Sequence, residues 1–396
     1  MGKPWLHIIG LGEDGPAGLS DASREILARA DVIFGGPRHL ELVGAGARGR
    51  AWPIPFDLAP VLALREGRPA DLEVVVLASG DPFWHGAGGS LVRHLSPQDW
   101  ICHPAVSSVS WAAARLGWRL EEVTSFGLHA APLARMRADL QQGAKLVVTL
   151  RGGAQVPDLG AYLTGLGFGA SELTVFEALG GPRERRHRMR ADQVAGHFGA
   201  PVLVAIAVAG GQGLPRGFGL PDDLFTHHGQ ITKRPVRALT LSALAPRMGE
   251  RLWDLGAGCG SISVEWALAG GRASALEPRP DRLAQIGQNA AQFGVEHRID
   301  IHEGQWPQTL PSAAPDAVFI GGGLSREGFE ALWARIPAGT RLVGNAVTLE
   351  SEALYLALQA ECGGHLLRVE LAEEAPLGRM RGWNRARPIL QWSAIR

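Results

Sequence analysis

The sequence is poor in cysteine, has no excess charge of either sign and contains no long apolar run, and each lack argues against a class of protein. Its 396 residues include three scattered cysteines, Cys102, Cys259 and Cys362, without zinc-ligand spacing, which favours a reduced, cytoplasmic setting. Basic and acidic residues both total 39, so the net charge attracts neither nucleic acid nor an anionic membrane. No run approaches the roughly 18 apolar residues that cross a bilayer, and we expect neither secretion nor a membrane span.

What the sequence does contain is an alternation of short apolar runs with helix-like segments. This pattern is typical of an α/β protein with buried, largely parallel strands. Gly and Pro then crowd the stretch between Ala209 and Phe225, which predicts a linker. We therefore expect one domain over residues 1–208, a linker over 209–225 and a second domain over 226–396. The apolar runs of the first domain include Leu6–Ile9, Val74–Ala78, Leu146–Leu150 and Val202–Val208.

A second alternation begins after the linker. It predicts a helix at about Arg234–Leu244 and five further strands. Two last strand-like runs, Leu366–Leu371 and Pro388–Trp392, are separated by a polar stretch and predict an antiparallel hairpin that closes the sheet. Together these segments predict a Rossmann-like sheet of seven strands whose last strand is antiparallel. The five strands are expected at Arg251–Leu255, Ala273–Leu276, Ile299–His302, Ala317–Ile320 and Arg341–Asn345.

A glycine-rich turn over residues 254–260 follows the first of these strands and precedes a helix-compatible segment. Its glycines would let the backbone approach a ligand at a helix N-terminus. The Gly-x-Gly-x-Gly spacing disfavours a dinucleotide, and Asp254 would repel phosphate but suit the cationic end of S-adenosylmethionine. Glu277 ends the next strand, where its carboxylate can accept hydrogen bonds from ribose hydroxyls. The alternatives are a packing turn without a ligand and, for Glu277, an ordinary surface acid.

The turn and three other segments, Asp222–Phe225, Ile231–Ala238 and Phe319–Gly322, resemble the C15-methylating, decarboxylating subunit of cobalamin biosynthesis. The resemblance implies that a set of residues at the strand ends surrounds S-adenosylmethionine: Thr232, Gly256, Ala257, Gly258, Cys259, Gly260, Glu277, Gly304 and Gln305. Inside the turn, Cys259 is better explained as a small packing residue than as a nucleophile, because no histidine is placed to activate it.

In the first half, Gly10–Gly15 matches Gly-x-Gly-x-x-Gly, but a lone match is weak evidence. The nearest spaced acid, Asp31, precedes the next strand instead of ending it, so we expect no nicotinamide or flavin site. Three loops that each follow an apolar strand, Gly35–Leu40, Ala78–Phe83 and Pro104–Ser108, together resemble the tetrapyrrole methyltransferase family over about residues 5–208.

That second resemblance implies two α/β lobes with a cleft between them. It implies that Gly80, Asp81, Ser107 and Ser108 hold S-adenosylmethionine and that Gly10 and Gly12 line the acceptor side. Asp81 has a simpler alternative, in which its carboxylate caps a turn. His85, His129, His227 and His228 are each better explained as ordinary loop histidines.

The chemistry needs little from the protein, since a methyl group on a sulfonium is already activated and has only to be aligned and kept from water. This agrees with the lack of metal-ligand clusters and nucleophile triads, and we expect no metal. A tetrapyrrole rich in carboxylates calls for local cations, which Pro182–Arg190 and Arg379–Arg387, with Arg379 and Arg381, could supply. His228, Lys233 and Asn345 are candidate proton donors for a decarboxylation.

With both halves in one chain, the resemblances imply S-adenosylmethionine-dependent methylation of a precorrin at C5 and C15, with decarboxylation, on the way to precorrin-8. We expect a precorrin substrate, no nucleic-acid or membrane partner, and a homo-oligomer. One alternative is an RNA methyltransferase whose first half is a binding module. A non-enzymatic tetrapyrrole carrier is a further alternative.

Overall fold

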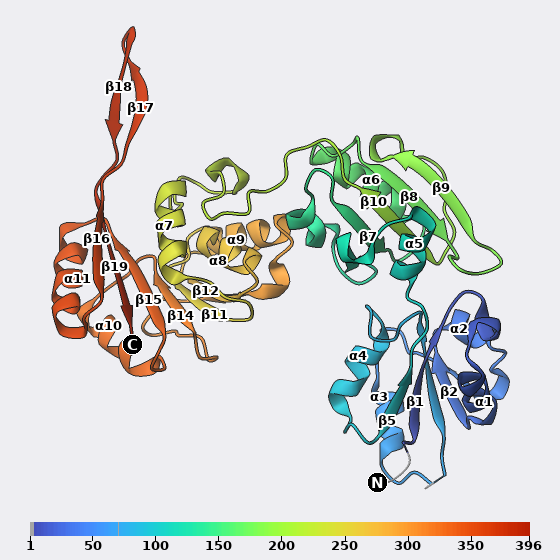
Figure 1. Cartoon of the computed structure of the whole chain (residues 1–396). Coiled ribbons are helices and arrows are strands. Elements are labelled where there is room, and N and C mark those ends of the chain that lie inside the picture. The colour runs from blue at the N-terminus through green and yellow to red at the C-terminus, as the bar shows by residue number, and fades with distance from the viewer. Residues whose placement is uncertain (1–3, 70) are drawn as a thin grey trace. The chain divides into compact units, whose positions relative to one another are not determined.

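The computed structural model describes residues 4–69 and 71–396 and divides into two compact units (Figure 1). Unit 1 contains residues up to 133 and residues 139–213, and unit 2 contains residues 134–138 and 214–396. The predicted first domain includes residues 1–3 and 70, which lie outside the described residues. The division at residue 213 falls within the span predicted as a linker, and Leu220 and Phe225 of that span are buried in the core of unit 2.

The first lobe of unit 1 is a parallel sheet with the strand order β3-β2-β4-β1-β5. Helices α1 and α2 cover one face and α3 and α4 the other (Figure 1). In β1, Ile9 faces the first pair of helices and Ile8 the second, which explains why the strand is continuously apolar. The elements are β1 (Leu6–Leu11), α1 (Asp21–Arg29), β2 (Val32–Gly35), α2 (Pro37–Leu42), β3 (Gly49–Ala51), α3 (Ala59–Leu62), β4 (Val74–Ser79), α4 (Ala87–Leu91) and β5 (Trp100–His103).

The second lobe is a mixed sheet with the order β6-β7-β10-β8-β9. Only β6 and β7 pair in parallel here, and the other neighbours are antiparallel. The expectation of largely parallel strands therefore holds for the first lobe and is wrong for this one. A short connection, as between β8 and β9, can only join antiparallel neighbours. The elements are α5 (Ser108–Leu116), β6 (Val123–Gly127), β7 (Lys145–Thr149), α6 (Gln155–Gly165), β8 (Glu172–Glu177), β9 (Arg185–Arg190) and β10 (Val202–Ala207).

Unit 2 has a seven-stranded sheet with the order β13-β12-β11-β14-β15-β19-β16. Residues of α7, α8 and α9 pack on one face and residues of α10 and α11 on the other. Among the described residues, no helix is both long and apolar enough to cross a membrane. The elements are α7 (Arg234–Leu244), β11 (Arg251–Leu255), α8 (Ser261–Leu268), β12 (Arg272–Glu277), α9 (Pro280–Gln292), β13 (Ile299–Glu303), β14 (Ala317–Ile320), α10 (Arg326–Arg335), β15 (Arg341–Ala346), α11 (Leu349–Cys362), β16 (His365–Val369) and β19 (Ile389–Ile395).

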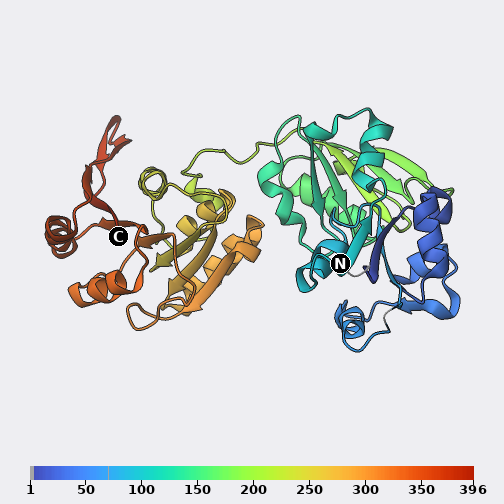
Figure 2. The ribbon, with the colours of Figure 1, turned by 60° about the horizontal axis from the view of Figure 1, so that its bottom comes forward.

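The predicted seven strands with an antiparallel last strand are confirmed, and the last two strands, β16 and β19, pair antiparallel at the edge of the sheet, as expected for the closing hairpin. Only β19 is reversed, because it pairs antiparallel with both β15 and β16. The polar stretch between the last two strands forms a ribbon of its own, β17 (Ala372–Leu377) and β18 (Met380–Arg385). Figures 1 and 2 show this ribbon extending away from the sheet, so its Arg residues do not close the sheet.

Arg237 on α7 anchors the segment that leads into unit 2. Its guanidinium is fully buried and donates to Glu265 Oε1 at 2.6 Å and to Asp222 Oδ1 at 2.9 Å. Glu265, itself buried, accepts in turn from the backbone N–H groups of Gly219 and Leu220, at 2.7 and 3.0 Å. This buried ion pair therefore ties residues 219–222 to α7 and α8.

Replacement of Arg237 by Leu should destabilise unit 2 by about 3–5 kcal/mol, because Glu265 would remain buried without a cation. The measurement is denaturant-induced unfolding of the full chain, followed at the unit 2 transition. Arg247→Leu is the matched control, since the Arg247 side chain is 66% exposed and its pair with Glu250 should contribute less than about 1 kcal/mol. Equal losses for the two variants would contradict the anchoring role of Arg237.

Candidate functional site

The carboxyl ends of β13, β12, β11 and β14 meet at one edge of the unit 2 sheet. The chain runs from β11 outward through β12 to β13 and then returns to β14 on the opposite side of β11. The order of strands thus changes direction between β11 and β14. Open α/β sheets bind their ligands in the crevice at such a switch point.

The turn that follows β11 occupies this switch point. Its glycines Gly256, Gly258 and Gly260 have φ angles of 76°, 60° and 78°, a left-handed region that residues with a Cβ rarely adopt. A Cβ on Gly256 would also lie 3.1 Å from the backbone nitrogen of Gly322. The predicted turn therefore needs glycine both for its conformation and for the close approach of the β14 end.

Two carboxylates lie beside this turn. Glu277, at the end of β12, accepts from the N–H of Gly258 at 2.9 Å and from that of Arg279 at 3.2 Å. Asp254 is fully buried in β11 and accepts from Ser263 Oγ at 2.6 Å. Burial raises the pKa of Asp254 to about 6, and nearby Glu277 adds to this, against the hydrogen bonds of Ser263. The second Asp254 oxygen, Oδ1, is buried and has no partner among the described residues.

The segment before α7 passes over the turn. Asn289 on α9 joins the two by donating to the carbonyl groups of Thr226, at 3.0 Å, and Cys259, at 2.9 Å. A Cβ on Gly258 would lie 3.6 Å from the carbonyl oxygen of Gln230. The segment that carries Thr232 is therefore held next to the turn, as the predicted site requires.

Sequence reasoning missed Asn289 and Gln285, which pairs its amide with His228 Nδ1 at 2.9 Å. Both are buried, and they lie four residues apart on the inner face of α9. A polar pair at that spacing on an otherwise apolar helix face was the available signal. Cys259 is buried and burial raises the pKa of its thiol, which supports the packing interpretation.

The loop after β13 completes the edge. Gly304 donates to the carbonyl of Glu277 at 3.3 Å, and Trp306 donates from its indole to the carbonyl of Gly322 at 2.8 Å. Gln305, between them, is exposed. The predicted cofactor residues of unit 2 thus come from four segments that meet at the same edge of the sheet.

The other predicted residues of unit 2 lie apart from this turn or are engaged elsewhere. Lys233 is exposed, 3.7 Å from Asp222. The Asn345 amide donates to Thr240 Oγ1 at 2.9 Å and accepts from Gln391 Nε2 at 2.9 Å, so it bridges α7, β15 and β19. Arg379 and Arg381 lie on the ribbon that follows β16 in the chain. β16 itself lies four strands, or about 19 Å along the sheet, from β11.

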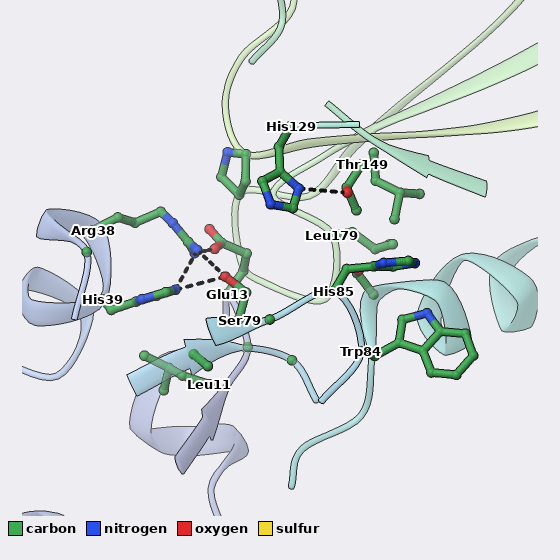
Figure 3. Close-up of a pocket in the computed structure, with 18 of the residues that line it drawn as sticks. Leu11, Glu13, Arg38, His39, Ser79, Trp84, His85, His129, Thr149 and Leu179 are labelled. Carbon is green, nitrogen blue, oxygen red and sulfur yellow. Dashed lines mark hydrogen bonds and ion pairs between the residues drawn. The ribbon is translucent and has the colours of Figure 1, made fainter. Parts of the chain in front are cut away.

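Unit 1 contains a pocket lined by both of its lobes (Figure 3). Of the predicted residues, Gly12, Gly80 and Ser108 line it. Gly10 is not among the lining residues but packs against Gly80, which is: a Cβ on Gly10 would lie 2.1 Å from the carbonyl oxygen of Gly80. The two remaining residues cap local structure: Asp81 accepts from Phe83 N at 2.8 Å, and Ser107 accepts from Ser110 N at 3.0 Å.

One side of this pocket is polar. Glu13 forms an ion pair with Arg38, and Arg183 Nη2 lies 3.5 Å from a Glu13 oxygen. Arg38 also donates to Ser79 Oγ at 2.9 Å, and His39 Nε2 lies at the same distance from that oxygen. Burial, together with the charge of Arg38, lowers the pKa of His39 to about 4. The His39 imidazole is therefore neutral at neutral pH. Both it and the permanently charged guanidinium of Arg38 contact Ser79 Oγ.

Asp254→Asn should stabilise unit 2 at neutral pH. The folded-state pKa of Asp254 lies above its ordinary value, so the folded form binds the proton more tightly and stability falls as pH rises from about 4 to 6. The variant cannot ionise and should gain on the order of 1–3 kcal/mol at pH 7. Calorimetry at about pH 5 and about pH 7.5 should show a smaller difference in Tm for the variant than for the original chain. Asp300→Asn, at a half-exposed carboxylate, is the control and should leave that difference unchanged.

Comparisons with known proteins agree with the two units. The family described as tetrapyrrole (corrin/porphyrin) methylases matches residues 5–195, and the precorrin methyltransferase domain family matches residues 223–396. A solved structure, the C-terminal domain of precorrin-6Y C5,15-methyltransferase from Rhodobacter capsulatus, is 53% identical. That match covers 46% of this chain and 100% of the solved one, with a TM-score of 0.45.

Two curated relatives match almost from end to end. Precorrin-6Y C(5,15)-methyltransferase [decarboxylating] of a Sinorhizobium species is 46% identical, over 99% of this chain and 96% of the relative. The protein of the same name from Mycobacterium tuberculosis (strain CDC 1551 / Oshkosh) is 40% identical, over 99% of this chain and 100% of the relative. The chain therefore belongs to the family of decarboxylating precorrin-6Y C(5,15)-methyltransferases.

Proposed function

We propose that unit 2 binds S-adenosylmethionine at the turn after β11. The observation that carries this proposal is the pair of buried carboxylates beside three left-handed glycines, since the partnerless Oδ1 of Asp254 fits a cationic group and Glu277 fits ribose hydroxyls. Bound there, S-adenosylmethionine would supply a methyl group already activated on sulfur. The residues that would hold it are Thr232, Gly256, Ala257, Gly258, Cys259, Gly260, Glu277, Gly304 and Gln305.

We further propose that the two methylations are divided between the two domains. Residues 1–208 would methylate the precorrin at C5, and residues 226–396 would methylate C15 and release carbon dioxide. In the first domain, Gly80, Asp81, Ser107 and Ser108 would hold a second S-adenosylmethionine, with Gly10 and Gly12 on the acceptor side. Because curated relatives at 40–46% identity over the whole chain are named for precorrin methylation, the RNA methyltransferase alternative is not carried forward.

Substrate binding would rest on local cations, since the net charge of the chain is zero and a precorrin carries many carboxylates. Arg379 and Arg381, on the exposed ribbon, are the proposed contacts in unit 2. The conjugated macrocycle would take up the electron pair left by the departing carbon dioxide. His228, Lys233 and Asn345 are the proposed sources of the proton that follows, and of these His228 and Lys233 are exposed.

We also propose that the chain forms a homo-oligomer and acts in the cytoplasm on a soluble precorrin. The ribbon of β17 and β18 supports the first part, because its side chains Leu377, Met380 and Trp383 are 69–77% exposed. Apolar side chains exposed together in this way are typical of a surface that another protein covers.

Titration calorimetry of the full chain should find two S-adenosylmethionine sites, and one substitution in each unit should abolish one of them. Gly258→Val adds a branched side chain where φ is 60° in unit 2. Gly80→Val does so where φ is 55° and the Cβ would lie 3.2 Å from the Ser107 backbone, in unit 1. Each variant should retain one site and lose one methylation, C15 for the first and C5 for the second.

Gly249→Val is the matched control, because Gly249 is also left-handed, with φ of 82°, but has open space around its Cβ position and lies outside both sites. It should retain both sites and both methylations. A single S-adenosylmethionine site in the original chain, or loss of C5 methylation in the Gly258 variant with C15 methylation intact, would contradict the proposed division.

A further inference from the structure

His85 lies on the wall of the unit 1 pocket in a backbone conformation that its residue type rarely adopts. It follows β4 in the loop of residues 80–86, and its φ is 57°. A residue with a Cβ pays about 1–3 kcal/mol for this left-handed conformation, and such residues cluster at active sites. The pocket wall therefore holds His85 in a strained conformation.

The loop is fixed on both sides of His85. Trp84 N donates to the carbonyl of Asp81 at 3.1 Å, and a Cβ on Gly86 would lie 2.6 Å from the carbonyl oxygen of Pro82. The loop is therefore tightly folded, and its backbone sets the direction of the His85 side chain. The Asp81 carboxylate is turned back onto the N–H of Phe83.

The imidazole is held from the second lobe. His85 Nε2 lies 3.1 Å from Ser125 Oγ on β6, and the ring packs on Gly127, where a Cβ would approach its Nδ1 to 3.1 Å. In the tautomer whose Nε2 donates its hydrogen to Ser125, the lone pair of Nδ1 is left to accept a proton. Figure 3 shows His85 on the pocket wall, next to Trp84 and below His129.

The surroundings keep this imidazole neutral. Burial lowers the pKa of His85, and repulsion from His129 lowers it further, against the hydrogen bond with Ser125. Burial and the charge of Arg151 likewise lower the pKa of His129. The other titratable side chains on the pocket wall are Glu13 and Arg38, which pair with each other, and His39. No carboxylate contacts His85 among the described residues.

We propose that His85 is the proton acceptor for carbon methylation in the unit 1 pocket, an inference that rests on the proposed C5 methylation by this unit. When methyl replaces hydrogen on a carbon, a π electron pair of the macrocycle forms the new carbon–carbon bond. The pair of the broken methyl–sulfur bond stays on sulfur. The displaced hydrogen then leaves as a proton to Nδ1, and the electron pair of its carbon–hydrogen bond restores the conjugated system. His85, which is exposed and lines the pocket, afterwards releases the proton to water.

His85→Gly removes the imidazole without straining the loop, because glycine adopts the left-handed conformation freely. The Tm should stay within about 2–4 °C of the original, since the relief of strain offsets the added freedom of the unfolded chain. The initial rate of C5 methylation should fall by about 100-fold or more. The assay uses the full chain, a reduced precorrin and S-adenosylmethionine with a ¹³C-labelled methyl group, and carbon NMR separates the two methyl positions.

Two further variants separate proton transfer from shape. His85→Asn tolerates the left-handed backbone and retains a hydrogen-bonding side chain, but it cannot accept the proton and should be as slow as the glycine variant. Added imidazole should restore C5 methylation in His85→Gly and have no effect on His94→Gly, an exposed control outside the pocket. Proton NMR of the ligand-free chain should show that the His85 imidazole, identified by its absence from the variant, titrates below the ordinary range for histidine.

C5 methylation at the original rate in His85→Gly or His85→Asn would overturn the proposal. So would an NMR titration of His85 above the ordinary histidine range, because the side chain would then already be charged at neutral pH. Failure of the original chain to methylate C5 would instead overturn the proposed function of unit 1. The two failures are therefore distinguished within one set of measurements.

Discussion

Both units depend on the close approach of backbone segments where parallel strands end. In unit 1 a Cβ on Gly10 would lie 2.1 Å from the carbonyl oxygen of Gly80, and in unit 2 a Cβ on Gly321 would lie 2.6 Å from that of Gly256. Real side chains do not tolerate either distance, so only glycine allows the ends of neighbouring strands to meet. The same approach brings the loops that follow neighbouring strands together at each carboxyl edge.

The two units stabilise that edge in different ways. Unit 2 buries charge: Arg237 and Glu265 hold the entering segment, and Asp254 lies without a full set of partners beside the glycine turn. An unsatisfied buried carboxylate lowers stability, and functional sites are where proteins retain such groups. Unit 1 instead brings two lobes together around its pocket, with Glu13 and Arg38 paired at the wall and neutral imidazoles nearby.

Strong local patterns in the sequence predicted much of this arrangement. The apolar run at Val74–Ala78 became β4, and the turn at residues 254–260 connects β11 to α8 as expected, because glycine spacing and apolar runs are local properties. Thr232 was harder to predict: its place next to the turn depends on Asn289, whose side-chain amide donates to the carbonyl groups of Thr226 and Cys259, 63 and 30 residues earlier in the chain. No local pattern in the sequence indicated the contacts of Asn345 on β15, whose amide bonds Thr240 on α7 and Gln391 on β19.

By itself the sequence determined the α/β alternation, the glycine turns and the order of the two units, since burial on both faces of a strand and left-handed backbone each restrict residue type locally. Only the tertiary structure decided that β19 lies between β15 and β16 in unit 2 and that the second lobe of unit 1 is mixed, because the order and direction of strands depend on which neighbours pair. It also decided which histidines matter. His85 is one loop residue among several in the sequence, and only the approach of the loop after β4 to β6 places its imidazole against Ser125 and on the wall of a pocket.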